Sequence, residues 1–94
     1  MAWFLVQTRY VREKFAEVRP RHREWLSERA ADGVCKIAGP LADDSGAVMI
    51  FEAAAEEDLT KILDTDPYHL EGALAERAVR EFNPVLGAWV SPAT

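Results

Sequence analysis

The chain has 94 residues, of which 49% are hydrophobic and 29% are charged, and its formal net charge is −5. This length allows one domain, residues 1–94, and the composition is that of a globular protein rather than a disordered chain. No apolar run approaches the roughly 20 residues that span a bilayer, and the negative charge argues against a nucleic-acid partner.

The N-terminal segment, Met1–Tyr10, is apolar but has neither a basic leader nor a small-residue cleavage site, which argues against a signal peptide. The single cysteine, Cys35, excludes an internal disulfide. Because it suits a reducing compartment, we expect a cytoplasmic protein with Cys35 as a small core residue.

The segment Ala2–Arg9 is rich in Trp, Phe, Leu and Val, which predicts a strand. Trp3 and Leu5 would face one way while Phe4 and Val6 face the other. Both faces of this strand therefore require burial.

A helix is predicted over Glu13–Ala31, because one side of it carries side chains at three- and four-residue steps: Phe15, Val18, His22, Trp25 and Leu26. Pro20 lies inside this pattern and lacks the backbone N–H that a helix interior needs. We therefore expect the main helix to begin at Pro20 and to end at Asp32-Gly33, with Gly33 in the left-handed conformation.

Two strands follow. Val34–Ala38 is predicted to end at Gly39-Pro40, and the turn residues of Leu41–Gly46 predict a loop or hairpin connection. Ala47–Ala53 is the next strand and is again apolar on both sides, which gives it two faces to bury.

A second helix is predicted from Glu56, since an acidic first turn suits a helix N-terminus; its buried stripe is Leu59, Ile62 and Leu63. Asp66-Pro67 then begins a short helix to about Ala73, with Asp66 as N-cap and Pro67 at the first helical position. Glu76–Phe82 predicts a more polar edge strand. The tail that follows, Val85–Thr94, has one expected anchor, Trp89.

The order strand, helix, strand, strand, helix, strand is that of a ferredoxin-like α+β fold, with helices on one face of an antiparallel sheet. Helices on one face leave the other uncovered, yet the first and third strands are apolar on both sides. A second copy packed sheet to sheet about a twofold axis would cover it. We expect a homodimer, with pairing into larger rings left open.

Two residues are candidates for acid–base chemistry. His22 is a candidate general acid or base, or alternatively a satisfied core or interface group. Asp66 is a candidate orienting carboxylate, or alternatively a helix cap that contributes about 1 kcal/mol. Both roles of Asp66 are compatible if one carboxylate oxygen caps the helix while the other faces His22.

Arginines cluster in the first third of this acidic chain: Arg9, Arg12, Arg19, Arg21, Arg23 and Arg29. They are either solvated helix faces or a patch that attracts a small anionic substrate. Arg9 and Arg19 are the candidates to bind a carboxylate or phenolate, on charge grounds.

Ser45 and Tyr68 complete the candidate substrate-binding set, although Ser45 is first a turn residue without a nucleophile motif, and Tyr68 either packs or lines a pocket. His69 is expected to be exposed. Two histidines and one cysteine without paired ligand spacing argue against a metal site. The chain also lacks a phosphate-binding glycine loop, so we expect no cofactor.

Six short motifs occur in a characteristic order and spacing: R-P-R-H-R-E-W-L (Arg19–Leu26), A-D-G (Ala31–Gly33), A-G-P-L (Ala38–Leu41), S-G-A-V-M-I-F (Ser45–Phe51), D-P-Y (Asp66–Tyr68) and F-N-P (Phe82–Pro84). With them the chain resembles the YciI-like (YCII-related) family over about Ala2 to Gly87. The resemblance implies a dimeric ferredoxin-like fold of the dimeric α/β barrel type, similar to muconolactone isomerase.

The resemblance also implies that a histidine and an aspartate face a shared pocket as a catalytic dyad, and these map onto His22 and Asp66. Tyr68 stands where the family often has phenylalanine, which adds a hydroxyl near the site. One member of the family looks like a dehydrochlorinase of chlorinated hydroxyhydroquinones, and most members have no assigned role.

Two hypotheses follow. In the first, the protein is a small cofactor-independent lyase or isomerase, in which His22 moves a proton on a small cyclic or unsaturated anionic substrate and Asp66 orients the imidazole. In the second, it is a non-enzymatic dimeric domain that binds a small ligand or a protein. The His22–Asp66 pair is then a structural hydrogen bond that pins the short helix to the main one.

Overall fold

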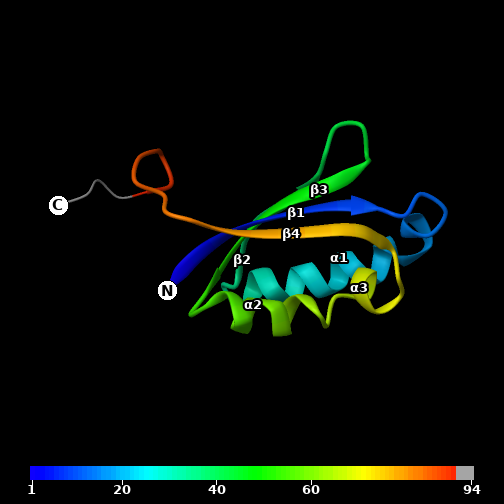
Figure 1. Cartoon of the computed structure of the whole chain (residues 1–94), viewed down its shortest axis with the longest axis horizontal. Coiled ribbons are helices and arrows are strands. Elements are labelled where there is room, and N and C mark those ends of the chain that lie inside the picture. Colours follow the sequence, from blue (N-terminus) through cyan, green and yellow to red (C-terminus); the bar gives the residue numbers. More distant parts are fainter. Residues whose placement is uncertain (91–94) are drawn as a thin grey trace.

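Four strands and three helices make up the computed structural model, which describes residues 1–90: β1 (Ala2–Tyr10), α1 (Phe15–Ala31), β2 (Cys35–Pro40), β3 (Gly46–Ala53), α2 (Glu56–Leu63), α3 (Pro67–Leu70) and β4 (Leu74–Phe82). The strands form one antiparallel sheet in the order β2-β3-β1-β4. All three helices lie on the same face of this sheet (Figure 1). The predicted ferredoxin-like α+β fold is confirmed.

The two central strands alternate as predicted. Phe4 and Val6 of β1 are buried among the helices, and Met49 and Phe51 of β3 lie on the same face. They form the main core with residues from the helices and β2: Trp25, Cys35, Leu59 and Leu63. Cys35 is thus a core residue, as expected.

The opposite face of the sheet carries apolar side chains that residues 1–90 leave partly uncovered. Val48 is 36% exposed and Phe82 is 41% exposed, and Phe82 lies beside Trp3 with 6.5 Å between the ring centroids. Trp89, which was predicted to anchor the tail, is 72% exposed and lines a cavity with Trp3, Ile50 and Phe82. The rest of the predicted tail, residues 91–94, lies outside the described residues.

Helix α1 continues through Pro20, so the prediction that the main helix begins there is wrong. The buried side chains lie on both sides of the proline, Val18 before it and His22 and Trp25 after it. Docking this stripe offsets the missing backbone hydrogen bond. Pro20 itself is exposed.

Other boundaries also differ from the predictions, most of them by one or two residues. Strand β2 runs on through Gly39 to Pro40, which an edge strand tolerates because its outer backbone groups need no partner. Helix α3 ends at Leu70 rather than Ala73, and β4 begins two residues early, at Leu74. β4 is an edge strand, as predicted.

Gly46 marks the start of β3 because no side chain fits there. A Cβ atom on this residue would lie 1.9 Å from the backbone oxygen of Thr8 in β1. The loop of residues 41–45 lies at the end of β1, where the Ser45 oxygen accepts the Tyr10 N–H at 2.9 Å, and its Asp44 contacts Arg19 of α1. None of the helices among residues 1–90 is long and apolar enough to cross a bilayer.

Candidate active site

His22 and Asp66 lie in direct contact although 44 residues separate them in the sequence. Nδ1 of His22 is 2.8 Å from Oδ1 of Asp66, and the two side chains are only 7% and 5% exposed. α1 supplies the histidine from its buried stripe, and the start of α3 supplies the aspartate. Because a carboxylate accepts the hydrogen bond, Nδ1 carries the hydrogen and Nε2 presents a lone pair.

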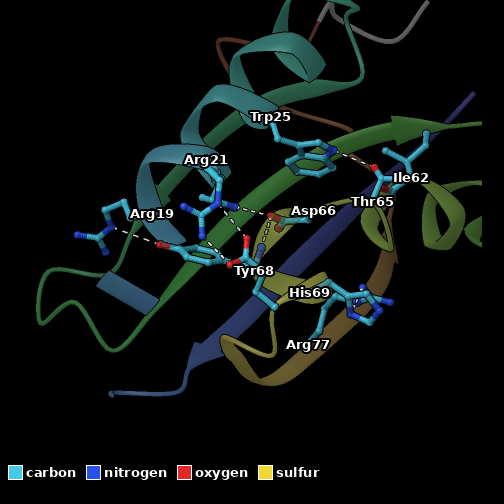
Figure 2. A network of polar contacts seen from close by, with 11 residues as sticks. Arg19, Arg21, Trp25, Ile62, Thr65, Asp66, Tyr68, His69 and Arg77 are labelled. Carbon is cyan, nitrogen blue, oxygen red and sulfur yellow. Dashed lines mark hydrogen bonds and ion pairs between the residues drawn. The ribbon is translucent and has the colours of Figure 1, made fainter. Parts of the chain in front are cut away.

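The same carboxylate oxygen also caps α3. Oδ1 of Asp66 accepts the backbone N–H of Tyr68 at 2.9 Å, and Pro67 occupies the first turn, as predicted (Figure 2). The two roles of Asp66 are combined without any division between its carboxylate oxygens. One atom carries both contacts, so the helix cap fixes the position of the oxygen that holds the imidazole.

Aromatic rings enclose the imidazole. The Tyr68 ring stacks on it at 3.9 Å between centroids and 18° between planes, and Trp25 lies at 6.2 Å. Nε1 of Trp25 donates to the Thr65 hydroxyl at 2.9 Å, which ties α1 to the segment before α3 (Figure 2). An exposed ion pair also links α1 to the end of α3: Nε of Arg21 donates to Oε2 of Glu71 at 2.9 Å. His22 therefore has little freedom to turn.

Nε2 of His22 is not fully buried, although the side chain as a whole is only 7% exposed. None of the described residues hydrogen-bonds to it, whereas no fully buried side-chain nitrogen or oxygen in residues 1–90 lacks a partner. His22 and Tyr68 line a cavity of about 430 Å³ between α1 and the strands β2 and β3. Its apolar wall includes Leu26, Pro40 and Met49.

The cavity lining is basic although the chain is acidic. None of the lining residues is Asp or Glu, and three of them are cationic: Arg19, Arg23 and Lys36. Lys36 pairs with Glu52 at 3.3 Å, whereas Arg23 has no ion pair among residues 1–90. Such a lining favours a small anion.

Arg19 is a cationic lining residue that contacts Tyr68, the ring that stacks on the imidazole. Its Nε donates to the Tyr68 hydroxyl at 3.3 Å (Figure 2), and its Nη2 lies 2.7 Å from Oδ1 of Asp44. The pKa of Arg19 is raised above its usual value, chiefly by the bond to Asp44 and then by Tyr68. It therefore stays charged at any working pH.

Tyr10 forms the far wall, with its ring 5.3 Å from that of Tyr68 and 4.5 Å from that of Phe15. Burial raises the pKa of Tyr10, the nearby Tyr68 adds to the rise, and Arg19 opposes it. Burial likewise raises the pKa of the Cys35 thiol, which lines the same cavity. Both groups are neutral at pH 7.

The structure does not bring two of the predicted substrate-binding residues to this cavity. Arg9 alternates with the core residues of β1, so it points to the opposite face of the sheet, where it pairs with Glu76 at 3.2 Å. Ser45 is exposed in the loop and bonds to Asp43. His69 is exposed, as expected, and lies beside Asp64 and Arg77.

Sequence reasoning missed Asp44 and Tyr10. Tyr10 continues the inward alternation of Phe4, Val6 and Thr8, which was the available signal. Asp44 carried no local signal beyond that of a turn, because its contact with Arg19 spans 25 residues. Within residues 1–90, no three His, Cys, Asp or Glu side chains gather closely enough to hold a metal ion.

The sheet order and the helices on one face place the chain in the ferredoxin-like class. The profile of the YCII-related domain matches residues 2–83, and the chain belongs to this family. No curated protein matches the sequence.

Several solved structures share the fold. The dehydrochlorinase of 5-chloro-2-hydroxyhydroquinone (TftG) from Burkholderia phenoliruptrix AC1100, in complex with 2,5-dihydroxybenzoquinone, is 19% identical, with a TM-score of 0.75 over 86% of this chain and 93% of its own. An antibiotic biosynthesis monooxygenase is 17% identical, with a TM-score of 0.64 over 92% of this chain and 100% of its own. Rv0793 from Mycobacterium tuberculosis is 14% identical, with a TM-score of 0.61 over 93% and 97%.

Proposed function

We propose that this protein is a small cofactor-independent enzyme that transfers a proton on a small anionic substrate. The observation that carries the proposal is the buried contact between His22 and Asp66, 2.8 Å from Nδ1 to Oδ1, in which His22 lines a basic cavity and its Nε2 is not fully buried. A histidine fixed by a carboxylate at one nitrogen presents the other as a general base or acid.

In this proposal Nε2 of His22 takes a proton from a C–H or O–H group of the substrate. The electron pair left behind forms a new double bond and, in an elimination, expels a leaving group such as chloride. In an isomerisation the proton returns to another carbon of the same molecule. Asp66 stabilises the imidazolium by its opposite charge and holds the ring in one orientation.

The cavity supports the proposed substrate class. The contact of Arg19 with the Tyr68 hydroxyl supports binding of a carboxylate or phenolate oxygen there, and Arg23, which has no ion pair among residues 1–90, adds positive charge to the lining. A volume of about 430 Å³ with aromatic walls suits a single ring. A chlorinated hydroxyhydroquinone, which TftG acts on, is therefore one candidate, and an unsaturated lactone acid is another.

The test uses these two chemistries as probes. 5-Chloro-2-hydroxyhydroquinone would report elimination through chloride release, and muconolactone in deuterated water would report proton transfer through loss of C–H signals. The proposal expects turnover of at least one probe and a fall of about 100-fold or more in His22→Gln. The matched control is His69→Gln, which changes the exposed histidine and should keep full activity.

We also propose a homodimer in which the open sheet face is covered by a second copy. Support comes from the partly exposed apolar side chains of β1, β3 and β4 on that face, among them Val48 and Phe82. A cytoplasmic location stays a prediction from the single cysteine, Cys35.

A second function is favoured by one specific contact. Oδ1 of Asp66 also caps α3, so the pair stabilises the fold whether or not it reacts. In that case the protein is a dimeric module that binds a small anion without turning it over. Binding of both probes without chloride release or deuterium uptake, in the wild-type protein and in His22→Gln alike, would establish this function instead.

A further inference from the structure

The Arg19 guanidinium has two partners, one buried and one partly exposed. Its Nε faces the buried hydroxyl of Tyr68, while both Nη atoms are taken by Asp44, at 3.3 and 2.7 Å. The Arg19 side chain is 23% exposed and that of Asp44 is 46% exposed. The Asp44 carboxylate thus contacts the guanidinium at its more exposed end, and Asp44 itself is not among the residues that line the cavity.

The loop presents Asp44 in a fixed way. Its φ of +59° is the only positive value among the non-glycine residues of the described chain, and its N–H donates to the Leu41 oxygen at 2.8 Å. Asp43 accepts both the N–H and the hydroxyl of Ser45, at 3.0 and 2.6 Å, which closes the turn. Aspartate tolerates this left-handed backbone better than most residues.

We propose that Asp44 determines the charge specificity of the cavity by competing with anionic ligands for Arg19. A partly exposed ion pair contributes little to folding, yet this one takes one N–H from each Nη atom, the end-on pair of donors that a bidentate carboxylate can use, while Nε faces the Tyr68 hydroxyl. A small ring with one anionic group binds only when Asp44 leaves the guanidinium. This inference rests on the proposed anionic ligand, but it concerns binding rather than proton transfer.

The test compares a charged probe with a neutral one of the same shape, benzoate and benzamide, titrated at fixed ionic strength and followed by NMR. The variant is Asp44→Asn, because asparagine keeps the size and the tolerance for positive φ while losing the charge. Removing the competitor should tighten benzoate binding about three- to tenfold and leave benzamide unchanged. The matched control is Glu76→Gln, which removes the same charge from an arginine pair on the opposite sheet face and should change neither affinity.

A double variant, Arg19→Gln with Asp44→Asn, should lose the gain. The inference is overturned if benzoate binds wild type and Asp44→Asn equally, or if benzoate saturates neither protein. It is also overturned if benzamide gains as much as benzoate, which would mean only a looser loop, or if the double variant keeps the gain. Failure of the proton-transfer proposal would look different, because a gain in Asp44→Asn does not depend on turnover of any probe.

Discussion

The ring of Tyr68 lies face to face with the imidazole of His22, with centroids 3.9 Å apart, and is only 1% exposed. The ring therefore matters more to the site than the hydroxyl. Tyr68→Phe keeps the stack and loses the bond to Arg19, at an expected cost of about 0.5–1.5 kcal/mol in the free energy of unfolding. Tyr68→Ala opens a cavity against His22, at about 3–5 kcal/mol. Urea unfolding of the two variants checks this, and equal losses would contradict it.

Substitutions of Asp66 separate its two roles. Asp66→Asn retains an oxygen that caps α3, so its free energy of unfolding should fall by no more than about 1 kcal/mol. Asp66→Ala loses the cap and leaves Nδ1 of His22 buried without an acceptor, at about 2–4 kcal/mol. Both variants should lose turnover of the probe substrates. An Asp66→Asn protein with unchanged turnover would show that the charge on this residue plays no chemical part.

Replacing Pro20, which lies inside α1, should raise the free energy of unfolding. Pro20→Ala restores the hydrogen bond from residue 20 to the carbonyl of Ala16 inside α1, which favours the helix by up to about 3 kcal/mol. Greater freedom of the unfolded chain offsets part of this, so we expect a net gain of about 1–2 kcal/mol. Thermal unfolding measures it, with Glu24→Ala as an exposed control on the same helix. A loss of stability would mean that the proline shapes the packing of α1.

The ion pair between Arg21 and Glu71 predicts a pH-dependent stability. Hydrogen bonding from Arg21 lowers the pKa of Glu71 below its ordinary value of 4.5. Since the folded-state pKa is the lower one, the stabilisation is complete above 4.5 and is lost as the pH falls through the folded-state pKa. The stability difference between wild type and Glu71→Gln should therefore shrink from about pH 5 to pH 3. Denaturant unfolding across this range checks the sign, and a difference that grows toward acid would contradict it.

The open sheet face predicts that dimerisation depends on apolar side chains of β3. Ile50→Lys places a charge on this face and should weaken the proposed dimer at least about 30-fold. Leu70→Lys makes the same kind of change on the helix side, at a residue that is 68% exposed, and should leave the dimer intact. Light scattering after gel filtration measures the mass of both variants. A wild-type monomer would refute the proposed dimer outright.

Local patterns were enough to predict the strands and the overall order of elements. In the first strand, the alternation predicted that Phe4 and Val6 pack on one face of the sheet and Trp3 and Leu5 on the other. The prediction of a helix break at Pro20 was wrong because local helix propensity does not include the packing of buried side chains on both sides of the proline. His22 and Asp66 were identified as candidates from their positions and a family resemblance, while their contact follows only from the docking of α3 on α1.

The charged part of the site was less predictable. Charge alone does not distinguish Arg9 from Arg19. The alternation of side chains along β1 places Arg9 on the sheet face opposite the helices, away from the cavity. Asp44 reaches Arg19 across 25 residues through a left-handed turn, a relationship that no short motif contains.

The carboxylate that orients His22 sits at the end of α3, a helix of only four residues. So short a helix has no stability of its own and stays formed only while it is docked. Segments of this kind open separately from the rest of a protein, at a lower free energy than global unfolding. Warming should therefore detach Asp66 from the imidazole while the sheet is still intact, so that the proposed activity is lost before the protein melts. Hydrogen exchange at the Tyr68 amide should report the same opening.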